Sequence, residues 1–197
     1  MEYAVWRYEG LEDDLAWIEI KLPEELDARS HHLAFGIPSS SWFPEGVVLD
    51  LSADHGIRLA DAVPNAHSLL VVSEKLKKVL ENCGATFEFF EVKLRNQRGR
   101  MVPEPFFVAH LLDIVECVDK EQSEFEMSHI LRDQVLYFSR CVLDETRIPE
   151  RAKIFRLQEK KKVIIVTVSF AREIIRQHKC VGIYFQQLEH YGKEFRK

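Results

Sequence analysis

The sequence has few of the residues that mark fibrous, linker-like or membrane proteins. Its 197 residues include only eight glycines and seven prolines, too few for a collagen-like chain or an extended linker. The most apolar stretch, residues 106–118, contains His110, Asp113 and Glu116, whereas a membrane-spanning helix needs roughly 18–20 apolar residues. Because 46% of the residues are hydrophobic, the chain is also too apolar for intrinsic disorder. These absences predict a single globular domain over residues 1–197 with no membrane partner.

Cysteines are scarce and widely separated. The four cysteines form no C-x-x-C pair, so neither a zinc ribbon nor a thioredoxin-type site is expected. The first seven residues lack a basic start followed by an apolar run, so no secretory signal is expected. Each cysteine has apolar neighbours, which is typical of buried free thiols in a reducing cytoplasm. We therefore predict a cytoplasmic protein with four reduced thiols: Cys83, Cys117, Cys141 and Cys180.

The usual cofactor and catalytic motifs are also missing. The sequence has no P-loop, no G-x-G-x-x-G and no G-x-S-x-G, the loops that cradle phosphates or present a hydrolase serine. The eight histidines lack metal-ligand spacing, and the doublet His31–His32 would point to opposite faces of a strand. The basic clusters 95–100 and 160–162 are short, and the isoelectric point is about 5.9, which argues against nucleic acid. No metal, cofactor or nucleic-acid partner is predicted.

The formal net charge of −5 hides an uneven distribution. Residues 1–66 hold thirteen acidic and four basic side chains, a net charge of −9, whereas residues 67–197 hold nineteen acidic and 23 basic ones, a net charge of +4. An acidic N-terminal third would repel nucleic acid and attract a basic partner. The alternative is an ordinary solvated surface with no partner.

The first third of the chain predicts short strands separated by loops. Residues 3–8 and 16–22 are expected to be strands, the second because apolar and polar residues alternate along it. Residues 23–46 are rich in proline, glycine and serine, which predicts a loop. Another short strand is expected at 47–51, and a helical turn at 60–63 before Pro64.

The middle of the chain predicts a strand, a helix and a second strand. Residues 69–72 and 86–94 are the expected strands, and Ser73 is a suitable N-cap for the helix between them. Gly84 is well placed to end that helix in the left-handed conformation. A basic turn at 95–100 then leads to a hairpin partner at 105–110, while residues 113–119 suit either a short helix or a strand. The helix has one apolar face, formed by Leu76, Val79, Leu80 and Cys83.

The last third repeats this order. Strands are expected at 135–142, 153–157 and 163–168, with residues 160–162 a turn or the start of the third. Ser169 is the predicted N-cap of a helix over 170–178, and Gly182 precedes a strand over 183–188. The order strand, serine, helix, glycine, strand thus occurs at 69–94 and at 163–188, and we interpret it as supersecondary similarity rather than a true repeat. Together the elements predict a single α+β domain with a mixed or mostly antiparallel sheet and a few short helices.

Two arrangements are candidates for catalysis. Asp54 and His55 are adjacent, and Cys117 lies near His110 and His129 in the sequence. Either pair is compatible with acid–base or nucleophilic chemistry, although a dyad is defined by spatial proximity and not by sequence spacing. A small-molecule enzyme built on one of these pairs is therefore an alternative function.

Three stretches of the chain resemble a known family. The first comprises residues 59–62, 69–80 and 87–94, the second residues 106–108 and 115–123, and the third residues 154–157, 163–166 and 182–188. Their spaced apolar and turn residues resemble those of the bacterial immunity proteins of polymorphic toxin systems, immunity-protein family eleven. The resemblance covers residues 59–188, a family-like scaffold, while the acidic, loop-rich residues 1–58 are only loosely similar.

The resemblance implies a protein that binds a cognate toxin in the cytoplasm and inactivates it without catalysis. Such a role needs a complementary surface, and an acidic face would steer association with a toxin that carries a basic surface. Trp42 and Phe43 occupy a loop, where they either plug the core or anchor a partner. A regulatory or assembly domain without a toxin partner is a third possibility. The candidate partner-binding residues are Glu12, Asp13, Asp14, Trp42, Phe43 and Asp54.

Overall fold

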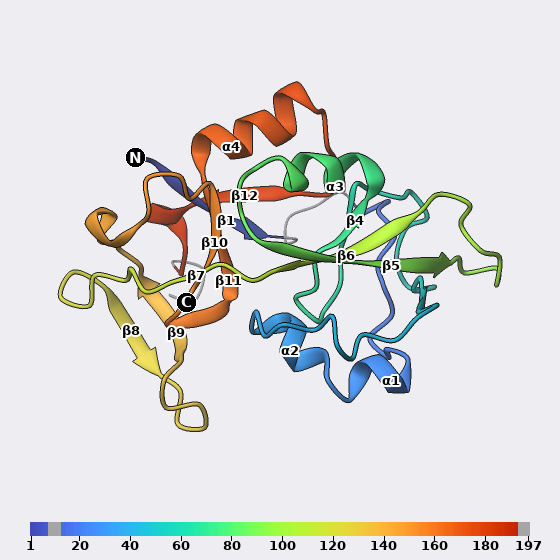
Figure 1. The fold of residues 1–197 in the computed structure, drawn as a ribbon, viewed down its shortest axis with the longest axis horizontal. Coiled ribbons are helices and arrows are strands. Elements are labelled where there is room, and N and C mark those ends of the chain that lie inside the picture. The colour runs from blue at the N-terminus through green and yellow to red at the C-terminus, as the bar shows by residue number, and fades with distance from the viewer. Residues whose placement is uncertain (8–12, 193–197) are drawn as a thin grey trace.

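Two five-stranded sheets and a two-stranded sheet form the fold (Figure 1). The structure is a computed structural model, and it describes residues 1–7 and 13–192. Short helices connect the strands, and most strand pairs are antiparallel. The predicted α+β domain with mixed sheets and a few short helices is confirmed.

The first sheet combines the two ends of the chain. Strand β1 lies between β12 and β11, so the first described strand pairs with two strands from the last forty residues. All pairs are antiparallel except β10 with β7. The sheet has the order β12 (Tyr184–Gln187), β1 (Tyr3–Arg7), β11 (Lys160–Thr167), β10 (Ile154–Leu157) and β7 (Ile114–Val115).

The second sheet is built from the middle of the chain. Its long central hairpin pairs β5 with β6, and the basic turn predicted at 95–100 joins these two strands. Only the pair of β2 with β5 is parallel. The sheet has the order β2 (Val48–Asp50), β5 (Phe87–Arg95), β6 (Phe106–Leu111), β4 (Val71–Ser73) and β3 (Ala62–Val63).

The two large sheets contain the same crossover. Helix α3 (Glu74–Glu81) connects β4 to β5, and helix α4 (Val168–Arg172), continued by a π-helical segment at Glu173–Gln177, connects β11 to β12. In each case the two connected strands run parallel with one antiparallel strand between them, β6 in one sheet and β1 in the other. The repeated order predicted from the sequence therefore corresponds to a repeated topology.

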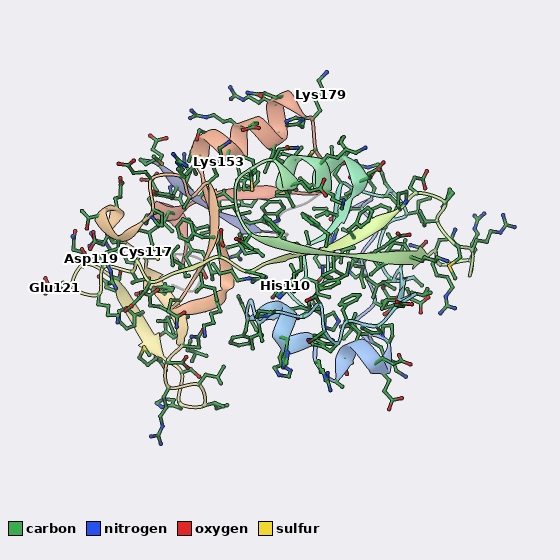
Figure 2. The ribbon with its side chains drawn as sticks, viewed as in Figure 1. His110, Cys117, Asp119, Glu121, Lys153 and Lys179 are labelled. Carbon is green, nitrogen blue, oxygen red and sulfur yellow. The ribbon has the colours of Figure 1, made fainter. Side chains whose placement is uncertain are left out.

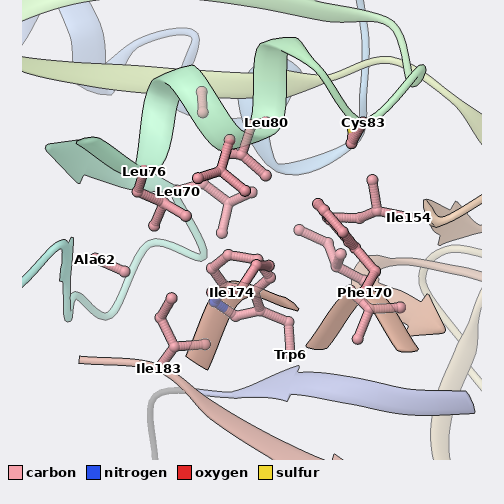
Figure 3. Close-up of a cluster of buried hydrophobic side chains, with 14 of the residues drawn as sticks. Trp6, Ala62, Leu70, Leu76, Leu80, Cys83, Ile154, Phe170, Ile174 and Ile183 are labelled. Atoms are coloured by element: carbon pink, nitrogen blue, oxygen red, sulfur yellow. The ribbon is translucent and has the colours of Figure 1, made fainter. Parts of the chain in front are cut away.

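Both large sheets bury apolar side chains on both of their faces. Along β1, Ala4 and Trp6 face a central core cluster that also contains α3 and α4, whereas Val5 faces a second cluster on the other side. The same alternation holds in β11, where Ile164 and Ile165 point to opposite clusters. Figure 3 shows side chains of β1, α3 and α4 meeting in the central cluster. Two-sided burial explains why these strands are continuous apolar runs in the sequence.

Two irregular segments cover the outer faces of the sheets. Residues 16–51, with α1 (Glu24–Asp27) and α2 (Ser30–Ala34), pack on the second sheet. Residues 117–148 pack on the first sheet, and they include the two-stranded sheet of β8 (Glu124–Met127) and β9 (Val135–Arg140). We call these segments the N-terminal cover and the central cover. Each is held by apolar side chains directed at the sheet below it.

Two predictions for the N-terminal third are wrong. Residues 16–22 are not a strand, because their neighbourhood forms only isolated bridges, Leu15 with Arg58 and Ile18 with Leu51. Residues 60–63 do not form a helical turn, since Ala62 and Val63 pair with β4 as strand β3. Helices α1 and α2 also occur within the predicted loop 23–46. In each case tertiary packing outweighs the local pattern.

The caps of the two crossover helices use the same chemistry. The Ser73 hydroxyl accepts a hydrogen bond from the Leu76 N–H, and Gly84 has a φ of +87°, as predicted. In the second crossover the cap is Thr167, which accepts from the Phe170 N–H. The prediction of Ser169 was wrong by two residues because β11 ends, and the helix begins, earlier than the apolar pattern indicates.

A buried arginine connects the two sheets to the N-terminal cover. Arg156 on β10 is 1% exposed, and its guanidinium donates to the carbonyl oxygens of Leu33, Ala34, Leu111 and Lys161 at 2.9–3.1 Å. These carbonyls belong to α2, to the end of β6 and to β11. One side chain thus supplies donors to both sheets and to the helix that covers one of them.

Two further buried groups hold the chain that follows α2. The Nε2 atom of His110 lies 2.8 Å from the carbonyl oxygen of Ile37, so this nitrogen carries the proton and donates. The Glu88 carboxylate accepts from the Ser39 N–H at 2.7 Å. Burial lowers the pKa of His110, which keeps the imidazole neutral near pH 7. The second sheet therefore fixes the N-terminal cover with polar contacts as well as apolar ones.

The substitution Arg156→Met is expected to lower the free energy of unfolding by at least about 3 kcal/mol, because it leaves several buried carbonyls without donors. Urea unfolding followed by tryptophan fluorescence measures this. The control Arg98→Met removes an exposed arginine and is expected to change stability by less than about 0.5 kcal/mol. Equal unfolding midpoints for the two variants would contradict the assigned role of Arg156.

Candidate functional site

The structure brings three of the predicted acidic residues together at one end of the N-terminal cover. The Asp14 carbonyl accepts from the Arg58 N–H at 3.0 Å, and a Cβ atom on Gly56 would lie 1.9 Å from the Asp14 backbone. The turn that contains Asp54 therefore lies directly against the turn that contains Asp13 and Asp14. We call this the acidic turn pair. Glu12 lies outside the described residues.

Some of the carboxylates in this region form ion pairs with arginines, and others do not. The Asp14 carboxylate accepts two hydrogen bonds from Arg58, at 2.7 and 3.0 Å. Nearby, Asp50 accepts two from Arg95 at 2.5 and 2.7 Å, and this arginine lowers the pKa of Asp50. Asp13 and Asp54 are exposed, and no ion pair connects them to the rest of the described chain. Their charge is the most available to a partner.

The two loop aromatics lie elsewhere on the same cover. Phe43 stacks on Phe90 with ring centroids 4.1 Å apart, and Trp42 lies against the Arg29 guanidinium. Both aromatics are half-buried and pack on the outer core cluster of the second sheet. The acidic turn pair lies near Arg95, five residues beyond Phe90 on β5, which corresponds to about 17 Å of strand. The aromatics therefore help close the core, and only their outer edges are accessible.

The first catalytic alternative is an exposed turn rather than a pocket. Asp54 and His55 are both exposed, and the His55 ring stacks on Trp17 with centroids 4.9 Å apart. The Asp54 N–H donates to the Ser52 hydroxyl, which shapes the turn. These contacts explain the conformation of both residues without a catalytic role.

The second candidate catalytic arrangement, Cys117 with a nearby histidine, is not brought together in the structure either. His110 is buried against Ile37 in the second sheet, whereas Cys117 is buried in the core cluster below the central cover. Figure 2 shows the two residues in separate parts of the fold. Burial raises the pKa of Cys117 to about 12, so the thiol stays protonated near neutral pH. His129 is exposed on the loop between β8 and β9.

Within residues 1–7 and 13–192, no group of three or more His, Cys, Asp or Glu side chains is arranged to hold a metal ion. In the same part of the chain, no helix is long and apolar enough to cross a membrane. The four cysteines are free and buried, as predicted.

A second acidic segment was missed in the sequence because charge was summed over thirds of the chain. Residues 116–145 hold eight acidic and three basic side chains, so the +4 of residues 67–197 combines −5 here with +9 elsewhere. Summing the charge over windows of about thirty residues would have revealed this acidic segment. This segment forms most of the central cover, and Asp119 and Glu121 lie at its edge (Figure 2). Its acidic residues are Glu116, Asp119, Glu121, Glu124, Glu126, Asp133, Asp144 and Glu145.

A comparison with protein families matches most of the chain. A model described as the immunity protein family Imm11 matches residues 19–190. The match extends beyond residues 59–188 and includes most of the N-terminal cover and all of the central cover. No curated protein matches the sequence.

The buried thiols predict chemical inertness. Burial raises the pKa of Cys117 and Cys141 to about 12 and that of Cys180 to about 11, so native protein near pH 7.5 should take up almost no iodoacetamide within minutes. Intact-mass spectrometry measures the uptake, and all four thiols should react in urea. The variant Ser41→Cys adds an exposed thiol as a positive control. Labelling of Cys117 as fast as this added thiol would indicate an accessible, activated cysteine.

Proposed function

Because the chain belongs to the immunity protein family Imm11, we propose that it binds a cognate bacterial toxin in the cytoplasm and neutralises it without catalysis. The observation that carries this proposal is the family match over residues 19–190. Neutralisation by binding needs a surface that covers the active site of the toxin or holds the toxin in an inactive state. It needs no reacting group in the immunity protein.

The charge distribution favours a toxin with a basic surface. Both outer covers are acidic, and the exposed Asp13 and Asp54 present carboxylates that are not already neutralised by an arginine. Complementary charge accelerates association and fixes the orientation of the partners more than it adds affinity. Toxins that act on nucleic acids or other anionic substrates need basic clefts, so an acidic cover matches the surface that such a toxin must expose.

Within this proposal, the acidic turn pair is one contact surface. Asp13 and Asp54 steer the toxin, and Asp14 either keeps Arg58 or exchanges it for a basic group of the toxin. Trp42 and Phe43 contribute apolar edges farther along the cover, because their half-buried rings are already held in place by Arg29 and Phe90. Glu12 completes the proposed acidic contacts.

Co-expression with a toxin encoded by the adjacent gene tests the function. The expected results are survival of the host cells and recovery of both proteins in a stoichiometric pull-down. A catalytically inactive toxin keeps the binding measurement independent of toxicity. Continued toxicity together with absence of a complex, at equal soluble expression of this protein, would refute the proposal.

Charge reversal tests the acidic turn pair. The double variant Asp13→Lys/Asp54→Lys is expected to associate with the toxin about tenfold more slowly at low salt, because two steering charges change sign. Biolayer interferometry at low and physiological salt measures the rates, and the difference should shrink as salt rises. Glu104→Lys/Glu150→Lys makes the same charge change at exposed positions outside both covers. Equal slowing by both double variants would assign the effect to net charge rather than to this surface.

A further inference from the structure

The hairpin of β8 and β9 carries an unusual number of exposed apolar side chains. Figure 1 shows it extending away from both large sheets, with its connecting loop at the far end. Ile130 in that loop is 90% exposed, and four other large side chains between residues 127 and 137 are 39–51% exposed. Contiguous exposed apolar surface on a soluble protein usually marks an interaction site. The five residues, which we call the hairpin tip, are Met127, Ile130, Leu131, Leu136 and Tyr137.

The hairpin tip is not needed by the core of the protein. Val135 and Phe138 of β9 are buried in the core cluster below the central cover, and Phe125 of β8 packs against the same cluster. These inward residues are sufficient to attach the hairpin to the first sheet. The side chains of the tip lie on the remaining positions and in the loop, where Ile130 is almost fully exposed and the other four are about half exposed.

The loop end of the hairpin is tied to the first sheet by hydrogen bonds. The Gln134 side chain donates to the Gln158 carbonyl at 2.9 Å and accepts from the Lys161 N–H at 3.0 Å. The Val135 N–H donates to the Glu159 carbonyl at 2.6 Å. These bonds join the hairpin to the turn between β10 and β11. An apolar tip that is already fixed in this way loses little conformational freedom when it binds, which favours affinity.

The loop itself is also ordered by a local cap. The Ser128 hydroxyl accepts from the Ile130 and Leu131 N–H groups at 3.3 and 3.0 Å, and the Ser128 N–H donates to the Gln134 carbonyl. The backbone of Ile130 and Leu131, the two apolar tip residues in the loop, is therefore fixed by hydrogen bonds.

The charge around the hairpin tip indicates what kind of partner surface it fits. The tip is part of the central cover, whose residues 117–148 hold seven acidic and four basic side chains, a net charge of −3. The hairpin itself contributes three of these acidic side chains and two of the basic ones, Arg132 and Arg140. Two copies of this surface would repel each other, and so would an anionic membrane. A basic protein surface with an apolar recess at its centre fits both features, because the acidic residues would meet the basic rim while the tip fills the recess.

We propose that the hairpin tip is the anchor by which this protein docks into the basic active-site cleft of its toxin, an inference that rests on the proposed immunity function. Ile130 and Leu131 enter the apolar floor of the cleft, and Glu124, Glu126 and Asp133 face its basic rim. A plug of this kind blocks access to the cleft sterically. It also gives the central cover a role that its packing on the first sheet does not require.

The double variant Ile130→Asp/Leu131→Asp tests the anchor in the full-length protein. Binding to the inactive toxin is expected to weaken about a hundredfold, since the variant removes two central anchors. The variant adds negative charge, so charge steering alone would not weaken its binding to a basic toxin. Met101→Asp/Ile175→Asp adds the same charge at exposed apolar positions outside both covers and should bind like the wild type. Ile130→Ser, with an unchanged melting temperature, separates lost contact from lost folding.

The outcomes distinguish this inference from the proposed function. If the wild type binds the toxin and rescues cells, and the hairpin-tip variant binds equally well, the inference is wrong and the immunity function stands. If the wild type neither binds nor rescues, the proposed function fails, and the inference fails with it. If light scattering shows that the wild type is a dimer that the hairpin-tip variant disrupts, with toxin binding unchanged, the occupant is a second copy. Tip-dependent binding to phosphatidylglycerol vesicles would likewise overturn the assignment.

Discussion

The need to bury apolar side chains on both faces of both large sheets is the constraint on which the rest of the structure depends. Sheets of continuous apolar strands cannot leave either face in water, so each needs chain on both sides. The inner faces share the cluster that contains α3 and α4, and the outer faces depend on the two covers. A cover must be apolar towards its sheet and polar towards water, and in this protein both covers lie in acidic segments. Arg156 connects the N-terminal cover to this arrangement by supplying donors to α2 and to both sheets at once.

This division of labour suits a protein whose role is recognition. The sheets and crossover helices form a scaffold with buried thiols and a buried neutral histidine, and the groups that we propose for partner binding lie in or beside the covers. The two covers differ in what they offer. In the proposed complex, the acidic turn pair supplies exposed carboxylates, whereas the hairpin tip supplies apolar side chains that are fixed at the loop end of the hairpin. Steering and anchoring are thus separated on the surface, which is compatible with a fast encounter followed by a long-lived complex.

Local patterns predicted the elements whose packing is regular, and they failed where tertiary contacts decide. Helix α3 was predicted with its cap because Ser73 and the apolar stripe are both local signals, and β11 was predicted because residues 163–166 form a run of β-branched side chains. Strand β3 was missed because two residues carry no pattern until β4 pairs with them. The Asp54–Asp14 proximity depends on Gly56 packing against a backbone forty residues away, which no spacing rule indicates. The central cover was detectable, but only from a charge count over a window as short as the cover itself.

The position of β1 has a consequence for folding during translation. The second sheet, from β2 to β6, is complete once residue 111 has been made, and it can fold around its own hairpin. Strand β1, made first, has no partners until β11 and β12 follow more than 150 residues later. Long-range pairing of this kind is slow to form. The first sheet, and the central cover that packs on it, therefore assemble after the second sheet, so the face that carries the hairpin tip becomes ordered only once β11 and β12 have been made.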